Sequence, residues 1–240
     1  MKVRVAACQQ NLQETLSEAS ISELQSFKPD FICLPEHYPL AAEIKNLQEA
    51  ADRFAERKQY LSDVSSTLQT IVVGGTLTEP TADGYYNTCY VFDRGQEVGS
   101  YRKVNPTSRE QSAGTLRGSE FKIFELAGLR VGVLICADVL FQESFEHLAA
   151  LRCQLTFVPT ASPYRPGEST EEKYQRDRSI FLEGARKMGC PIVKTCGVGT
   201  TFGHPIQGRS LITTTDDILI RAEPHQEQSS LILKAVLERM

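Results

Sequence analysis

Three polar residues of complementary chemistry lie just beyond apolar segments of this chain: Glu36, Lys103 and Cys136. A thiol nucleophile needs a base to take its proton and a positive group near the oxyanion that it creates. We interpret Glu36 as the base and Lys103 as the positive group, with the backbone N–H of Ala137 as a second donor. Taken alone, Glu36 or Lys103 could be a solvated surface residue, and Cys136 could be a buried structural thiol. The hypothesis therefore depends on the three residues occurring together.

The acid–base balance of this set decides whether the thiol can react. A free cysteine titrates near about 8.5 and a free glutamate near about 4.3, a mismatch of roughly 5.7 kcal/mol against proton transfer. We expect burial to raise the pKa of Glu36, and we expect Lys103 and a helix terminus to lower the pKa of Cys136. Protonated Glu36 could then donate the proton to a departing amine.

The segments around these residues predict the elements that position them. Val131–Cys136 is almost entirely apolar and indicates a strand buried on both faces, and Phe141–Arg152 indicates a helix after it. Polar side chains at the ends of such strands gather at one edge of an α/β sheet. Helices are also predicted at Leu12–Phe27, Ala41–Arg57, Tyr60–Leu68 and Glu171–Met188. Strands and helices alternate throughout, with hairpins at Asp93-Arg94-Gly95 and Ala127-Gly128, which predicts one α/β domain.

The composition excludes several classes of protein. The chain has 240 residues and a net charge of -4, which does not favour a nucleic-acid partner or an anionic membrane. No run of about 18 apolar residues and no apolar signal-peptide core is present, so we expect a cytoplasmic protein without a membrane partner. The 7 cysteines are odd in number and lack Cys-x-x-Cys spacing, and the 4 histidines lack ligand spacing. We therefore expect reduced thiols and no metal.

Three short segments together resemble the signatures of a known family. They are Leu34-Pro35-Glu36, Tyr101-Arg102-Lys103 and Ile135-Cys136-Ala137-Asp138. Their order and gaps are similar to those of the nitrilase superfamily, the carbon–nitrogen hydrolases. Val158-Pro159-Thr160-Ala161 and Gly208-Arg209-Ser210 resemble further landmarks of that family, and the resemblance extends over nearly the whole chain.

The resemblance implies a four-layer α-β-β-α sandwich, with residues 1–240 as a single carbon–nitrogen hydrolase domain. It implies Glu36 as general base, Lys103 as stabiliser of the tetrahedral intermediate and Cys136 as nucleophile. A small linear amide or N-carbamoyl compound would acylate Cys136 as a thioester, release ammonia or an amine, and be hydrolysed by water. No metal or organic cofactor is needed. Glu110 is the candidate for positioning Lys103 or the amine, and a homodimer is the assembly expected by analogy.

The chain departs from the family pattern around its nucleophile. Leu140 replaces an arginine, Gln142 a proline, and Asn105 a histidine after the lysine. Ala137 stands where members that hydrolyse nitriles usually carry tryptophan, which favours an amide substrate over a nitrile.

Aromatic and basic residues near the three segments are candidates for the substrate pocket. These are Tyr38, Phe141, Tyr164 and Arg165.

Two other classes of function remain open on the sequence. The altered surroundings of Cys136 are compatible with a binding or regulatory nitrilase-like protein of weak activity. Cys136 with His37 could also form a Cys–His enzyme or a redox site. Glu36→Gln and His37→Gln separate these hypotheses, because only the first should abolish turnover if Glu36 is the base.

Overall fold

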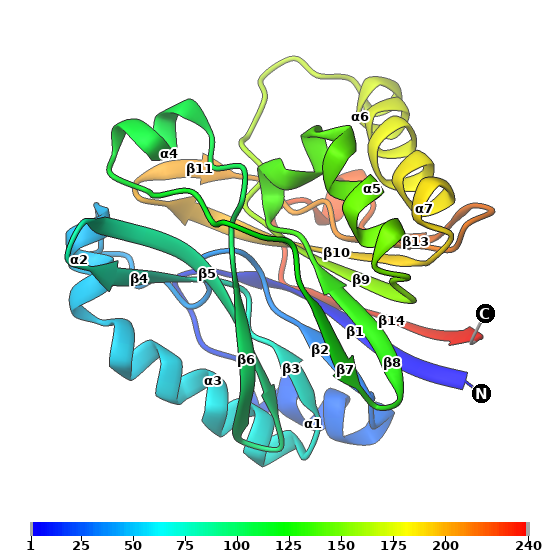
Figure 1. The fold of residues 1–240 in the computed structure, drawn as a ribbon, viewed down its shortest axis with the longest axis horizontal. Coiled ribbons are helices and arrows are strands. Elements are labelled where there is room, and N and C mark those ends of the chain that lie inside the picture. Colours follow the sequence, from blue (N-terminus) through cyan, green and yellow to red (C-terminus); the bar gives the residue numbers. More distant parts are fainter. Residues whose placement is uncertain (1, 239–240) are drawn as a thin grey trace.

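The computed structural model describes residues 2–238, which fold into four layers (Figure 1). Helices α1 and α3 lie on one side of two facing β-sheets, and helices α5 to α7 lie on the opposite side. Three separate apolar clusters fill the gaps between successive layers. The α-β-β-α sandwich predicted from the family resemblance is therefore confirmed.

The first sheet carries the segments that hold Glu36 and Lys103. Its centre is parallel: β1 (Lys2–Asn11) pairs with β2 (Phe31–Cys33), which pairs with β3 (Ile71–Val73). The remaining strands are antiparallel: β4 (Leu77–Thr81), β5 (Gly84–Asp93), β6 (Gln96–Arg102) and, beside β1, β14 (Leu231–Glu238). The β5–β6 pair is the hairpin that the sequence predicts around Asp93-Arg94-Gly95.

The second sheet carries Cys136. Its parallel centre joins β8 (Leu129–Val133), β9 (Leu155–Thr160) and β10 (Ile192–Thr201). Antiparallel strands complete it: β7 (Ile123–Leu126), β11 (His204–Ile206), β12 (Leu211–Thr213) and β13 (Ile218–Arg221). The β7–β8 pair is the second predicted hairpin. A short parallel pairing of β1 with β10 at Gln10 and Gly197 joins both sheets into one curled sheet.

The helices depart from the sequence prediction mainly at their ends. They are α1 (Glu18–Phe27), α2 (Leu47–Asp52), α3 (Phe54–Leu68), α4 (Ser108–Ser112), α5 (Gln142–Ala150), α6 (Thr170–Asp177) and α7 (Glu183–Met188), with short turns η1 (Cys136–Leu140), η2 (Arg178–Leu182) and η3 (Pro224–Gln226). The helix predicted from Leu12 begins only at Glu18, because the Ser17 side chain caps the backbone N–H of Ser20. The helix predicted at Ala41–Arg57 is wrong over its first residues, since α2 starts after its cap, Asn46.

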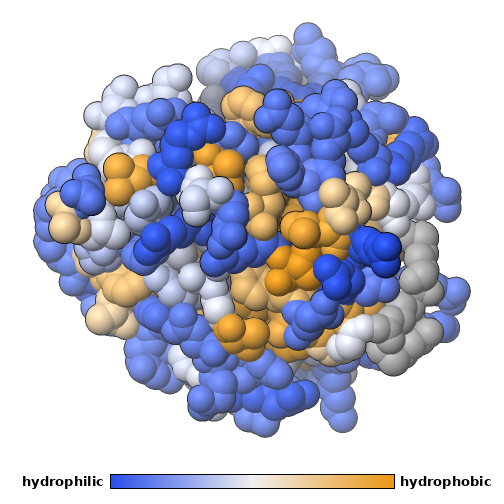
Figure 2. All heavy atoms as spheres, in the orientation of Figure 1, coloured by the Kyte–Doolittle hydropathy of each residue, from blue (hydrophilic) through white to orange (hydrophobic). Residues whose placement is uncertain are grey.

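The layers hold together through side chains that alternate along the strands. Phe31 on β2 and Phe157 on β9 meet between the two sheets with ring centroids 5.5 Å apart. Outside the sheets, Leu24 and Leu61 cover the first sheet and Phe145 covers the second. The surface differs from this apolar interior: hydrophilic residues make up most of the face drawn in Figure 2. None of the helices within residues 2–238 is long and apolar enough to cross a membrane.

Candidate active site

Cys136 lies at a strained turn between β8 and the short helix η1. Its φ angle is 43°, a left-handed conformation that non-glycine residues adopt mainly where surrounding contacts enforce it. Asp138, two residues on, provides that enforcement: its carboxylate accepts from the Ile135 backbone N–H at 2.9 Å and from the Tyr101 hydroxyl at 2.9 Å. The same carboxylate accepts from the Asn105 backbone N–H at 2.8 Å. Asp138 therefore ties the cysteine turn to the chain on either side of Lys103.

Lys103 brings two carboxylates together. Its ammonium donates to Glu36 Oε1 at 2.9 Å and to Glu110 Oε1 at 2.7 Å. The Lys103 side chain is only 1% exposed and Glu36 only 3%, so their charge-assisted bond is shielded from water, whereas Glu110 remains 22% exposed. Glu36 follows β2, and its second oxygen accepts from the Ala161 backbone N–H at 2.8 Å, which anchors it to the end of β9. The structure thus brings three predicted residues into one network.

Glu110 belongs to α4, a one-turn helix that the sequence does not predict. Thr107 and Glu110 form a reciprocal capping box, in which the Thr107 hydroxyl accepts from the Glu110 N–H and Glu110 Oε2 accepts from the Thr107 N–H. The cap leaves Oε1 of Glu110 free to face Lys103. The structure thus places Glu110 against Lys103, and the positioning role expected of it stays a prediction.

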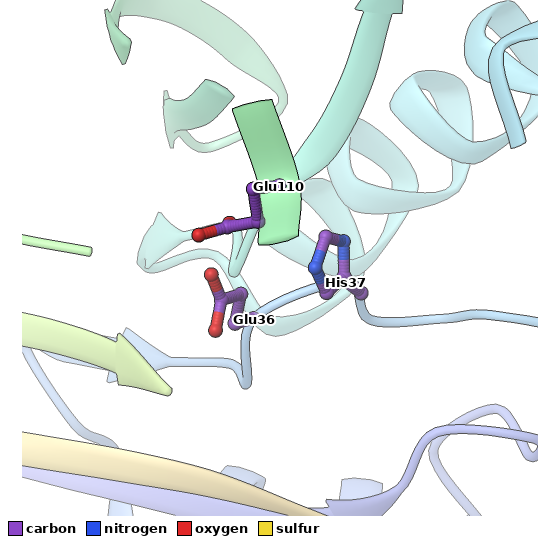
Figure 3. A group of neighbouring side chains, drawn as sticks. All are labelled: Glu36, His37 and Glu110. Atoms are coloured by element: carbon purple, nitrogen blue, oxygen red, sulfur yellow. The ribbon is translucent and has the colours of Figure 1, made fainter. Parts of the chain in front are cut away.

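Glu36, His37 and Glu110 could at first be taken for a metal site, because their ligand atoms lie within 4.8 Å of one another. Figure 3 shows that Glu36 and His37 come from one loop and that Glu110 reaches them from α4. The two carboxylates already share a cation, the ammonium of Lys103. The geometry accounts for both acids without an ion.

Asn87 on β5 is a member of this network that the sequence analysis missed. Its side-chain amide donates to Glu36 at 2.8 Å and to Glu110 at 3.2 Å. The backbone carbonyl of the same residue accepts from the Lys103 N–H at 2.9 Å. Asn87 precedes Lys103 by one hairpin, and only the pairing of β5 with β6 could have revealed that the two face the same site.

The charge state of the site corrects one expectation. Burial favours neutral Glu36, but the charge of the Lys103 ammonium outweighs it, together with His37 and with hydrogen bonds to Lys103 and the Cys136 thiol, and lowers the pKa to about 2. Burial and the neighbouring Glu36 carboxylate raise the pKa of the Cys136 thiol, although Lys103 opposes them. Contrary to the prediction, the two pKa values move apart. The physical reason is that the Lys103 ammonium bonds directly to the Glu36 carboxylate and stabilises its charge. A Cys136 thiolate would form beside that carboxylate and be repelled by it.

A cavity of about 740 Å³ opens onto this network. Glu36, Lys103, Glu110, Cys136 and Ala137 all contribute to its wall. The predicted pocket residue Arg165 also lines it, as does His37. Among the described residues, no hydrogen bond joins His37 to the sulfur of Cys136. The Cys136 thiol instead lies 3.8 Å from the Ala161 carbonyl oxygen.

Three predicted substrate-binding residues do not line the cavity. Tyr38 is fully buried and packs its ring against Tyr60 in the core beneath α3. Phe141 ends the η1 turn with its side chain turned to the surface, and Tyr164 is half exposed as well. The prediction placed them by distance along the sequence, but side-chain direction decides which residues face a cavity.

Comparison with known proteins identifies the family. The family model described as carbon-nitrogen hydrolase matches residues 4–238, and the chain belongs to this family. Among curated relatives, human omega-amidase NIT2 is 30% identical over 159 residues, which cover 62% of this chain and 58% of that protein. Nitrilase homolog 2 of Dictyostelium discoideum is 26% identical over 233 residues, covering 91% and 70%. The chain thus aligns with less than two thirds of the length of the human relative.

Solved structures of the same fold extend over the whole chain. The carbon-nitrogen hydrolase from Helicobacter pylori G27 superposes with a TM-score of 0.83 at 20% identity, covering 99% of this chain and 90% of that one. A mutant of the amidase from Nesterenkonia sp. AN1, with an acetamide moiety added covalently at its active-site cysteine, has a TM-score of 0.82 at 18% identity and covers 98% and 90%. These likenesses bear out the fold.

Proposed function

We propose that this protein hydrolyses the C–N bond of a small linear amide through a thioester on Cys136. The observation that carries the proposal is the position of the Lys103 ammonium, which contacts Glu36 at 2.9 Å and Glu110 at 2.7 Å within the cavity that Cys136 lines. A base, a cation and a thiol around one cavity are the groups that acyl transfer to a cysteine requires.

The resting site holds a Glu36 carboxylate, a Lys103 ammonium and a neutral Cys136 thiol, given the directions of the pKa shifts. Proton transfer to Glu36 therefore accompanies attack of the sulfur on the amide carbon. Lys103 and the Ala137 N–H stabilise the negative charge that develops on the carbonyl oxygen. Glu36 then protonates the departing nitrogen, and the C–N bond breaks to leave the thioester. Glu36 next deprotonates water, which attacks the thioester; the C–S bond breaks, the acid leaves, and Glu36 returns the proton to the Cys136 sulfur.

An amide is preferred over a nitrile as the substrate. Ala137 follows the nucleophile and lines the cavity, and the relatives named above are an omega-amidase and an amidase. The leaving group is ammonia or a larger amine. Glu110 supports Lys103 and, with Asn87, keeps the base oriented.

The experiment is ammonia or amine release from a panel of primary amides, monoamides of dicarboxylic acids and N-carbamoyl amines. We expect release by the wild type and none by Cys136→Ala, while Cys196→Ala, which changes a buried thiol outside the cavity, keeps activity. Intact-mass measurement after rapid acid quench should show an acyl adduct that is absent in Cys136→Ala. A folded wild type that releases nothing from the whole panel would contradict the proposal and favour a binding or regulatory protein.

We further propose a homodimer in a reducing, cytoplasmic compartment. The dimer is suggested by Leu140 and Phe141, two apolar side chains at the junction of η1 and α5 with 65% and 47% of their surface exposed. The compartment is suggested by the odd number of thiols in the sequence. Light scattering of the wild type and of Phe141→Ser tests the dimer: the variant should have half the mass at equal concentration, and a monomeric wild type would contradict it.

A further inference from the structure

The cavity beside Cys136 extends into a region that the proposed chemistry does not use. Its wall there is formed by Asp177, Lys194 and Arg209, together with apolar side chains from two short helical turns. Val139 belongs to η1, which Cys136 begins, and Ile180 and Phe181 belong to η2. These three side chains give this part of the wall apolar surface against which a chain of methylene groups could pack.

Lys194 is the unusual residue of this region. It lies on β10, in the middle of the second sheet, and is 3% exposed. Its ammonium donates to Asp177 Oδ1 at 3.3 Å and lies 4.6 Å from the centre of the Phe181 ring. An ammonium has three donors, and within residues 2–238 only the bond to Asp177 is formed. A buried charge with unused donors in a cavity wall is suited to a ligand that brings acceptors.

The ionic partners around Lys194 leave a positive excess. Asp177 alone faces three cations: Lys194 at 3.3 Å, Arg209 at 2.9 Å and Arg221 at 3.7 Å. The next carboxylate, Glu168, pairs with Arg176 and also lies 3.8 Å from Arg209.

A further ion pair of this cluster, between Lys173 and Glu227, adds no net charge. Lys173 and Glu227 lie 2.6 Å apart and neutralise each other. Across the described residues of this cluster, cations outnumber carboxylates, so an added negative charge would reduce the excess.

The helix that carries Asp177 changes its geometry at this wall. Residues Arg178–Leu182 form a π-helical turn between α6 and α7, where the sequence predicts one regular helix. Such turns widen a helix by one residue and occur frequently at functional sites. Here the turn presents Ile180 and Phe181 to the cavity while Asp177 reaches Lys194.

The separation of Lys194 from the nucleophile suits a short substrate. Lys194 pairs with Val158 on β9, and Ala161, three residues further along, contacts the Cys136 sulfur. Three residues of strand correspond to about 10 Å. The lysine side chain and a substrate of a few carbons together bridge such a distance.

We propose that Lys194 determines specificity by binding a carboxylate at the end of the substrate remote from the amide that Cys136 attacks. This inference rests on the proposed function and deepens it, since it assigns the substrate class as an amide with an anionic end and a short aliphatic spacer. Asp177 orients the lysine, while Arg209 contributes positive charge to the same wall. The apolar side chains of η1 and η2 contact the spacer and favour an aliphatic one.

The experiment compares two amides of equal length in the wild type and in Lys194→Met. One is succinamate, which carries a carboxylate, and the other is butyramide, which carries a methyl group in its place. Lys194→Met should raise KM for succinamate roughly 10- to 100-fold, the range for loss of a bond to a charged group. It should change kcat/KM for butyramide by less than about threefold. Lys194→Arg, which keeps the charge, should recover part of the succinamate activity.

Lys173→Met is the matched control, because Lys173 belongs to the same cluster but does not line the cavity. It should leave both amides unaffected. An equal loss for both amides in Lys194→Met, with the Lys173→Met enzyme normal, would overturn the proposal and assign Lys194 a structural role.

A binding measurement keeps this inference separate from the proposed reaction. Glutarate, a dicarboxylate without an amide, is titrated calorimetrically into the wild type, Lys194→Met and Lys173→Met. Binding by the wild type and Lys173→Met, but at least tenfold weaker binding by Lys194→Met, supports the anion site even if no amide is cleaved. Equal binding by all three proteins, or none, would overturn it whatever the outcome of the amide panel.

Discussion

At the scale of single residues, the site is organised by one buried ammonium. Lys103 holds Glu36 and Glu110 by two short bonds, and Asn87 donates to the same two carboxylates. This arrangement keeps Glu36 ionised and Cys136 protonated in the absence of substrate, given the directions of their pKa shifts. The proton therefore moves only when a substrate provides an electrophile for the sulfur.

The pKa of Glu36 predicts how stability depends on pH. The folded-state pKa is about 2 against an ordinary value of 4.5, so ionised Glu36 stabilises the fold above pH 4.5. That contribution, on the order of 3 kcal/mol, is lost as the pH falls from 4.5 through 2. Urea unfolding across this window should show a weaker pH dependence for Glu36→Gln than for the wild type. Equal slopes in both proteins would contradict the assignment.

The same shifts predict the pH profile of the reaction. Because the acidic limb belongs to a group with a pKa of about 2 and the thiol titrates above its ordinary range, neither group changes charge near neutrality. We expect kcat/KM to be flat from about pH 5 to about pH 8, where unperturbed Glu and Cys would still be titrating at the two ends. A step of slope one inside that interval would show that a different group controls catalysis.

Asn87 should act as a positioning residue. Asn87→Ala removes a donor that buried Glu36 and partly buried Glu110 share, so we expect kcat to fall roughly tenfold or more with little change in KM. Thr78→Val is the control, since Thr78 also lies at the cavity wall but its hydroxyl has no hydrogen-bond partner within residues 2–238. The test is to measure kcat and KM of both variants by steady-state kinetics, with circular dichroism to verify that they fold. Wild-type kcat in Asn87→Ala would refute the role.

At the scale of elements, the nucleophile depends on a turn held from outside. Strand β8 ends at Val133, and the strained backbone of Cys136 follows three residues later. The Asp138 carboxylate holds this turn by accepting from Ile135, Tyr101 and Asn105. The element that presents the thiol is thus fastened to the element that presents Lys103. A change in this link should affect both stability and chemistry.

Asp138→Asn tests this link. The amide offers one acceptor oxygen where the carboxylate serves three donors, so at least one buried donor loses its partner, at about 1–3 kcal/mol. Urea unfolding should show that loss, and kcat should fall in parallel. Glu125→Gln, which removes one partner of an exposed ion pair with Arg130, should change stability by less than about 0.5 kcal/mol. Similar stabilities of the two variants would contradict the proposed link.

At the scale of the whole molecule, the site exists because two sheets are packed face to face. Glu36 and Lys103 extend from the first sheet and Cys136 from the second, and both sheets share the core around Phe31 and Phe157. The relative position of base and nucleophile therefore depends on the thickness of this core.

Phe157→Ala should weaken that core by about 3–5 kcal/mol, because a fully buried aromatic ring is replaced by a cavity between the sheets. Chemical unfolding measures the loss, and kcat should fall with it as the sheets adjust. Val236→Ala, at a half-exposed position of β14, should remain within about 0.5 kcal/mol of the wild type. A Phe157→Ala protein of wild-type stability would contradict this account of the fold.

The sequence by itself determined the layers of this protein and the residues at its centre. The apolar periods of β1, β2, β8 and β9 predict buried strands, and the placement of Glu36, Lys103 and Cys136 beyond strand or hairpin ends predicts their convergence. Lys103 does meet Glu36 and Glu110, as expected, whereas the catalytic role of each residue stays a prediction. Such features are readable because they depend on local pattern and on a recognisable arrangement of strands.

Only the tertiary structure decided the environment of these residues. Asn87 lies 51 positions from Glu36, and Lys194 meets Asp177 from a different layer, so neither contact follows from local pattern. The predicted pocket residue Tyr38 proved to be buried in the core. The predicted directions of the pKa shifts were also wrong, because the Lys103 ammonium lowers the pKa of Glu36, whereas burial and the Glu36 carboxylate raise that of Cys136. The distances between these groups are set by packing between segments remote in the chain, and packing is what a sequence does not display.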